Sequence, residues 1–226
     1  ARDLVEQGWQ GFTTRMWVPA YLDMTVHFLS RFSFDTTTTA RSAHDEFFLA
    51  LTEQQSSTDR LWMAFEKLEE ATEIIDENDI GFAFPVPSLL MKHYQSDPVP
   101  EWWGTALNVY VEFLTELYRG GSNTAPHGYN YIFYYSKRSE FPLEYLTAVQ
   151  AVREAAIAKK EGNIETAQEK IALAIESIFN CMDILSDIGH DQSDRAIIAI
   201  LDAYAFRPLL EEQERLDEAA EAGEKQ

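Results

Sequence analysis

The residues best suited to bind a ligand are aromatic rings that have polar neighbours and stand at predicted loops or helix starts. A flat ring can stack on the C–H face of a sugar, while nearby guanidinium, imidazole and amide groups hydrogen-bond the hydroxyl groups. The chain has this combination at three places, which contain Arg15 and Trp17, Trp102 and Trp103, and His127, Tyr129, Asn130 and Tyr131. We take these as the candidate ligand-binding residues. Aromatic side chains at helix ends also close the rims of helical bundles, and this purely structural interpretation stays open.

A second kind of chemistry, metal binding, is suggested by His44-Asp45 and His190-Asp191. Such a pair resembles the metal-binding residues of helical phosphohydrolases, in which histidines from neighbouring helices complete the site. His27 could supply one of these, but no spacing enforces it, and a solvated surface pair is the alternative. Di-iron bundles use Glu-x-x-His instead, and none of the 5 histidines follows a glutamate at that spacing. We therefore assign no metal ligand.

Motifs for nucleophilic catalysis and for cofactor binding are missing from the sequence. It contains neither Gly-x-Ser-x-Gly nor a glycine-rich phosphate-binding loop. The single cysteine, Cys181, lies on a predicted apolar helix face, where a thiol is usually buried and unreactive. We assign no catalytic residue and expect no cofactor, which leaves open whether the chain is part of an enzyme.

The charge of the chain argues against two classes of partner. The sequence has 38 Asp and Glu residues against 18 Lys and Arg residues, for a formal net charge of -20 at pH 7. A field of this sign repels phosphate backbones and anionic lipid headgroups, so neither nucleic acid nor a membrane is an expected partner. No run reaches the roughly 18 consecutive apolar residues that a membrane span needs. We expect a soluble protein.

The elements that would position these residues are helical, and the clearest lie within residues 143–188. Apolar residues recur there at alternating steps of three and four from Ile164 to Leu185, and the same period precedes Gly162-Asn163. Two antiparallel helices that meet at Gly162-Asn163 are predicted. Their turn resembles that of a tetratricopeptide repeat, but no second copy follows at a period of about 34 residues, so an ordinary helical hairpin is the main interpretation.

The rest of the chain follows the same pattern. Apolar spacing, capping residues and proline or glycine punctuation predict further helices over 19–34, 40–53, 61–75, 102–118 and 196–205. Pro208 should break or kink the last of these at Arg207. The aromatic run 129–135 is interpreted as the start of a helix, although its composition would also suit a strand.

These elements predict an all-α protein. We expect antiparallel bundles of about seven or eight helices, with a long hairpin in the C-terminal half. The polar, helix-poor stretch 122–128 predicts a boundary between an N-terminal helical half, 1–121, and a C-terminal half, 122–226. One continuous domain is the alternative.

The N-terminal part of the chain resembles a known family. The run Trp17-Val-Pro-Ala-Tyr21-Leu is followed by Phe28, Phe34-Asp35, Asp45-Glu-Phe-Phe48 and a helix from Leu61. This order of an aromatic-Leu helix, an aromatic-Asp turn and an acidic-aromatic helix is similar to the helical region that follows the catalytic barrel in α-glucuronidases and related glycoside hydrolases. The resemblance covers roughly the first third of the chain. It implies a non-catalytic accessory part, because the paired carboxylates of that family lie on a barrel that this sequence does not encode.

One function hypothesis and two alternatives follow. We expect a non-catalytic helical accessory domain of a carbohydrate-active enzyme, a glycoside hydrolase, which supports or lines a glycan site. The expected partners are then a carbohydrate and the remainder of a longer polypeptide, since the sequence begins within an aromatic-rich segment. One alternative is a helical protein-interaction or oligomerisation module that binds another protein or a second copy through the 143–188 hairpin. The other is a metal-dependent hydrolase built on His44-Asp45.

Overall fold

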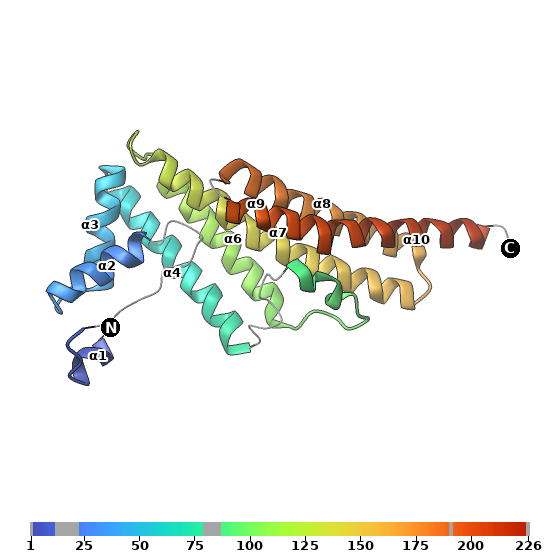
Figure 1. Cartoon of the computed structure of the whole chain (residues 1–226), viewed down its shortest axis with the longest axis horizontal. Coiled ribbons are helices and arrows are strands. Elements are labelled where there is room, and N and C mark those ends of the chain that lie inside the picture. Colours follow the sequence, from blue (N-terminus) through green and yellow to red (C-terminus); the bar gives the residue numbers. More distant parts are fainter. Residues whose placement is uncertain (1, 12–22, 79–86, 190–191, 225–226) are drawn as a thin grey trace. The chain divides into compact units, whose positions relative to one another are not determined.

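The computed structural model describes residues 2–11, 23–78, 87–189 and 192–224, and every regular element within these ranges is a helix (Figure 1). The all-α fold class is thus confirmed. The elements in chain order are α1 (Arg2–Glu6), α2 (Asp23–Phe34), α3 (Ala40–Thr52), α4 (Gln55–Asn78), the 3-10 helix η1 (Pro87–His93), α6 (Trp102–Gly121), α7 (Tyr129–Lys160), α8 (Ile164–Ile188), α9 (Gln192–Leu201), the π-helical turn η2 (Asp202–Phe206) and α10 (Arg207–Glu224). The aromatic run after residue 128 begins a helix, as predicted.

The helices form two compact units, and each unit is built from two separate stretches of sequence. Unit 1 contains Ala1–Leu68 and Glu112–Ser136, and unit 2 contains Glu69–Val111 and Lys137–Gln226. The helices α4, α6 and α7 each contribute residues to both units. The compact units therefore do not follow the boundary expected after residue 121, and the independence of the two sequence halves stays a prediction.

Unit 1 has a core of aromatic and leucine side chains. Phe48 from α3, Leu61 from α4, and Phe113 and Leu117 from α6 are buried completely or almost so. Phe65 contacts the rings of Phe48 and Phe113. Burial of each such side chain contributes about 2 kcal/mol to the free energy of unfolding, so this cluster is enough to hold α3, α4 and α6 together.

Two local features set the geometry of these helices. The Thr39 hydroxyl accepts a hydrogen bond from the Ser42 backbone N–H, and the Ser42 hydroxyl accepts one from the Thr39 N–H, which fixes the start of α3. A Cβ atom on Gly120 would lie 2.9 Å from the side chain of Leu61. Glycine at this position therefore lets α6 approach α4 closely.

The predicted long hairpin lies within unit 2 (Figure 1). Gly162 has a φ of 81° at the turn, and the Asn163 side chain accepts a hydrogen bond from the Thr166 backbone N–H to cap α8. The two helices run antiparallel, since Lys170 of α8 pairs with Glu154 of α7 near the turn. Small buried side chains let them pack closely, and these are Ala148, Ala151, Ala155, Ala167 and Ala174.

The tetratricopeptide-like turn does not extend to a tetratricopeptide-like architecture. Helix α7 alone has 32 residues and α8 has 25 residues. A whole repeat of that kind holds both helices in about 34 residues. The ordinary helical hairpin is therefore the correct description of this segment.

Of the two predicted effects of Pro208, a break or a kink at Arg207, the structure excludes the break. The chain widens into the π turn η2, in which the Arg207 N–H donates to the Asp202 carbonyl, and α10 follows without interruption. A proline removes one helical hydrogen bond and its ring crowds the carbonyl four residues earlier. The wider π turn accommodates both effects. With α9, η2 and α10 taken as one continuous helix, and the five-residue α1 and the 3-10 helix η1 set aside, the described residues form seven helices, within the expected number.

Candidate functional site

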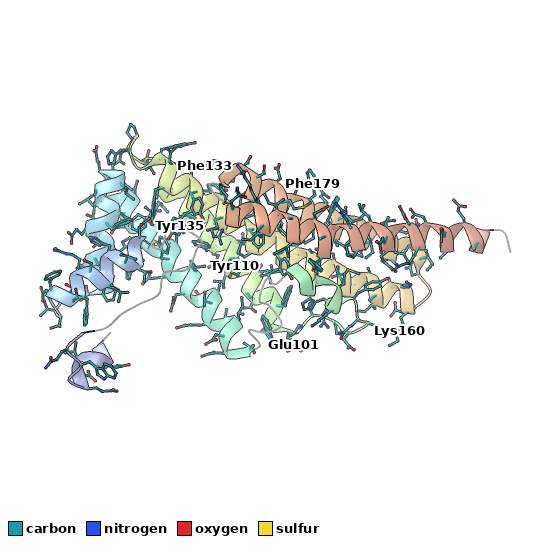
Figure 2. The ribbon with its side chains drawn as sticks, in the orientation of Figure 1. Glu101, Tyr110, Phe133, Tyr135, Lys160 and Phe179 are labelled. Carbon is teal, nitrogen blue, oxygen red and sulfur yellow. The ribbon has the colours of Figure 1, made fainter. Side chains whose placement is uncertain are left out.

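The first two turns of α7 carry the exposed part of the candidate ligand-binding residues. Tyr129 is 58% exposed. Phe133, one turn later and labelled in Figure 2, is 39% exposed. Their rings are nearly parallel, with centroids 6.0 Å apart and 17° between the planes. Asn130, which lies between them in the sequence, is also exposed. We call Tyr129, Asn130 and Phe133 the aromatic face. Phe133 is absent from the predicted residues, although its spacing of four from Tyr129 places both on one side of a helix.

His127 and Gly128 fix the position at which α7 begins. The His127 Nε2 atom lies 2.6 Å from the carbonyl oxygen of Ala50 in α3, and the Ala125 N–H donates to the Leu51 carbonyl. A Cβ atom on Gly128 would lie 2.5 Å from the Leu51 carbonyl oxygen, so the two backbones meet where only glycine fits. His127 is exposed as well as anchored. These contacts hold the aromatic face on a fixed helix start within unit 1.

Tyr131 packs inward instead. Its ring centroid lies 5.5 Å from that of Phe47, 6.3 Å from that of Phe48 and 5.0 Å from that of Tyr135. Burial, and then the nearby Tyr135, raise the pKa of the Tyr131 hydroxyl. The structure therefore places Tyr131 in the aromatic core of unit 1, which matches the structural interpretation of the aromatic residues at helix ends.

The two tryptophans at the start of α6 belong to unit 2 and differ in exposure. Trp103 is 1% exposed and lies in the core, whereas Trp102 is half-buried. Their ring centroids are 5.6 Å apart, with 54° between the planes. Of this pair, Trp102 alone offers accessible ring surface. The other two candidate residues, Arg15 and Trp17, lie outside the described residues.

His44, from the candidate metal pair, is buried in unit 1. Its ring packs against Phe48 and Trp62, with centroids 4.5 Å and 5.0 Å away, and its Nδ1 atom lies 3.4 Å from the Asp45 carboxylate. The Nε2 atom is buried without a hydrogen-bond partner of normal geometry. Burial lowers the pKa of this imidazole, although Asp45 opposes the shift. The neutral ring is therefore the stable form.

Asp45 forms an ion pair with an arginine. Arg41 forms ion pairs with Asp45 and with Asp59, and its guanidinium lies 5.2 Å from the centroid of the Trp62 ring. Nowhere in the described ranges do three His, Cys, Asp or Glu side chains gather in a way that could hold a metal ion. His190 and Asp191 lie outside those ranges. The metal-dependent hydrolase thus has no ligand set in the described part of the chain.

A buried carboxylate in unit 2 was not predicted. Glu212 of α10 accepts hydrogen bonds from the Tyr94 hydroxyl at 2.8 Å, from Lys159 Nζ at 2.6 Å and from Arg215 Nη1 at 3.0 Å. Burial by itself raises the pKa of the Glu212 carboxyl, but the three hydrogen bonds outweigh it, and the net pKa is lowered. This network ties α10 to α7 and to the segment after η1. The sequence does contain a sign of this network: Glu212 stands at helical spacing between Leu209 and Leu216, and all three side chains are buried on the same side of α10.

A buried cation, Arg153, supports the same segment. Arg153 of α7 donates to the carbonyl oxygens of Asp97 and Pro98, at 3.1 Å and 3.4 Å, which fixes the loop before α6. His93, at the end of η1, is also buried. Burial, and then the positive charge of Arg153, lower its pKa from 6.5 to about 4. Both polar networks of unit 2 therefore hold an irregular segment against α7.

The single thiol is inert, as its position in the sequence predicts. Cys181 is fully buried on α8, and its Sγ atom lies 3.7 Å from the carbonyl oxygen of Phe141. Burial raises the pKa of the thiol well above its ordinary value. The thiolate, which is the nucleophilic form, is therefore disfavoured.

Comparisons of the chain with protein-family models, with curated proteins and with solved structures find no match. Within the described ranges, the helices lack the combination of length and hydropathy required to cross a membrane. The geometry of the aromatic face and of the buried networks therefore carries the functional argument.

Proposed function

We propose that the chain is a non-catalytic helical accessory domain of a carbohydrate-active enzyme, and that it contacts glycan through the aromatic face. The observation that carries this proposal is the exposed, nearly parallel ring pair of Tyr129 and Phe133 with Asn130 beside it. Sugar rings present C–H groups on their faces and hydroxyl groups at their edges. Aromatic rings suit the first and an amide suits the second. The resemblance of residues 17–61 to the helical region of α-glucuronidases supports the same setting.

The buried polar groups support a role without catalysis. A catalytic acid, base or nucleophile must come within hydrogen-bond distance of the reacting atoms. His44, Cys181 and Glu212 have shifted pKa values, but each is enclosed in a core and held by neighbouring side chains or backbone. Such environments are typical of groups that stabilise a fold.

Calorimetric titration with a panel of neutral and acidic oligosaccharides tests the proposal. Tyr129→Ala and Asn130→Ala should each raise the dissociation constant about tenfold for any glycan that binds, since one stacking or hydrogen-bonding contact is lost. Phe34→Ala, which removes a still more exposed ring elsewhere in unit 1, is the control and should leave binding unchanged. Trp17→Ala and Trp102→Ala extend the test to the other candidate residues. Absence of binding across the whole panel would refute the proposal.

The second candidate function is a protein-interaction or oligomerisation module. Large apolar side chains are exposed on the C-terminal helices of unit 2, among them Phe179 on α8 and Tyr204 on η2. Exposed apolar residues that gather on one surface are typical of sites that bind other proteins. Light scattering distinguishes a dimer from a monomer, and a monomer that binds no other protein would argue against this candidate.

A further inference from the structure

The seam between α8 and the segment η2–α10 carries a line of apolar side chains. The two elements run antiparallel, because Gln168 donates to Asp217 at one end of the seam and the Phe179 ring contacts the Phe206 ring at the other. Residues that follow Gln168 at steps of four and three lie on the same stripe of α8. The apolar residues of the seam are Ala172, Ile175, Phe179 and Met182 from α8, Phe206 from η2, and Leu210 from α10.

This seam is partly open to solvent. Phe179 is 55% exposed and projects from α8 (Figure 2), and Leu210 is 39% exposed. Ala172 is exposed, while Ile175 and Phe206 are half-buried. Full burial of side chains such as Phe179 and Leu210 would contribute substantially to binding. The seam is therefore a shallow apolar strip and not merely the contact between two packed helices.

Both outer edges of the strip are acidic. Glu176 and Asp183 are one turn from Phe179 on α8, and Glu214 and Glu218 continue the line from Leu210 on α10. All four are exposed, and within the described part of the chain none of them pairs with a cation. An apolar strip between two uncompensated negative edges has a charge pattern that selects its partner.

We propose that this seam docks a basic amphipathic helix of a partner protein. The apolar face of that helix would cover Phe179, Phe206 and Leu210, and its lysine and arginine residues would meet the acidic edges. This mode of binding, a helix laid in a groove with anchors at helical spacing, matches a strip about 15 Å long, or about three helical turns, from Ala172 to Met182. The inference rests on the second candidate function and is independent of the aromatic face.

Charge also excludes the other simple occupants. Two copies of this chain meeting at the seam would bring their acidic edges together, and each copy has a formal net charge of -20. An anionic lipid surface would be repelled in the same way. A basic helix is the occupant that satisfies both the apolar strip and its edges.

Fluorescence anisotropy with a synthetic peptide tests the proposal. The probe is an amphipathic helix of about 15 residues with leucine on one face and lysine on the other, and a peptide with glutamate in place of lysine is its control. The lysine peptide should bind, and the glutamate peptide should not. Phe179→Ser should weaken binding at least about tenfold, as expected for an anchor residue. Leu173→Ser, which removes a partly exposed leucine of α8 outside the seam stripe, should leave it unchanged.

A second pair of variants tests the acidic edges. Glu176→Gln with Glu214→Gln should weaken binding at low salt and flatten its salt dependence, whereas Glu66→Gln with Glu73→Gln, on α4, should change neither. Equal binding of the two peptides, or an equal effect of Phe179→Ser and Leu173→Ser, would overturn the proposal.

Light scattering without peptide separates this proposal from the broader function. Self-association that is lost in Phe179→Ser would show that a second copy occupies the seam, which overturns the basic-helix proposal and leaves the interaction module standing. A monomer that binds neither the peptide nor any protein would overturn both. Circular dichroism of each variant confirms that the helices remain intact.

Discussion

His44 and Glu212 are both buried, yet their surroundings favour opposite charge states. Aromatic rings enclose His44 and oppose protonation, so the imidazole is stable as the neutral form. Glu212 is charged because Tyr94, Lys159 and Arg215 supply the hydrogen bonds that water would otherwise provide. At the scale of the residue, the stability of the fold therefore depends on these charge states. A change of pH or a single substitution that alters a charge state should lower the stability.

The first prediction concerns His93 and acid. Its pKa of about 4 in the folded protein lies below the value of 6.5 for a free imidazole. The folded state therefore binds this proton less readily than the unfolded state does, and the stabilisation, fully present above pH 6.5, is lost as the pH falls toward 4. The loss from His93 amounts to at most about 3 kcal/mol. An NMR titration should show the His93 imidazole protonating near the acid end of this window, and protonation near pH 6.5 would contradict the prediction.

The second prediction concerns the carboxylate of Glu212. Glu212→Gln removes the negative charge and leaves Lys159 beside a neutral amide, which should lower the free energy of unfolding by about 2 to 4 kcal/mol. Glu211→Gln, at the exposed neighbouring position, is the matched control and should change it by less than about 0.5 kcal/mol. Urea denaturation at neutral pH measures both. Equal effects of the two variants would show that the buried network does not contribute to stability.

At the scale of the element, a glycine just before α7 and a glycine within α6 have opposite roles. Gly128 stands where the backbone before α7 meets the backbone of Leu51, whereas Gly104 of α6 is exposed with no atom within 4 Å of an added Cβ. The same substitution should therefore have opposite effects at the two positions.

The third prediction follows from this contrast. Gly128→Ala should destabilise the protein by about 2 kcal/mol or more, because the new methyl group would overlap the Leu51 carbonyl and the backbone would have to move. Gly104→Ala should stabilise it by up to about 1 kcal/mol, since alanine is the better helix former. Thermal unfolding of the two variants gives the comparison. A similar change in both would show that the close approach of Gly128 to Leu51 does not decide the effect.

The elements differ in how much of them the sequence predicts. The α7–α8 hairpin, the start of α7 and the end of α3 follow from apolar period, glycine and capping residues, all of which act within a few residues. The π turn before Pro208 was not predicted, because the usual effect of proline in a helix is a break. A wider turn is another way to accommodate proline, and it retains helix on both sides.

The candidate site is less predictable than the elements. Tyr129, Asn130 and His127 are exposed as the sequence analysis expects, but Trp103 and Tyr131 are in the cores of their units. An aromatic residue at a helix start can face either way, and the direction depends on neighbours from distant parts of the chain. The Glu212 network was missed for the same reason, since its donors Tyr94 and Lys159 are far from it in sequence.

At the scale of the whole molecule, the important feature is that neither compact unit is a continuous piece of chain. The helices α4, α6 and α7 each contain residues of both units. When the part of such a helix in one unit unfolds, the adjoining turn in the other unit loses its helical hydrogen bonds. We expect the two units to lose their structure together and not in succession.

The fourth prediction tests this cooperativity. Variants that retain a single tryptophan, either Trp62 in unit 1 or Trp103 in unit 2, report on each unit separately by fluorescence. In urea, the fluorescence midpoint of each variant should coincide with the loss of helix that circular dichroism measures in that same variant. A fluorescence midpoint that differs from the circular-dichroism midpoint of the same variant would contradict this expectation and would indicate that the two units unfold independently.

The left-handed Gly162 at the tip of the hairpin has a practical consequence. The turn residues Glu161, Gly162 and Asn163 are exposed, and no atom lies within 4 Å of a Cβ placed on Gly162. Extra sequence spliced in at this tip would meet open solvent, and lengthening a loop costs only about 0.6 kcal/mol for each doubling. An affinity tag or a small fluorescent reporter can be inserted there, far along the chain from both Tyr129 and Phe179, to follow the protein while its ligands are identified.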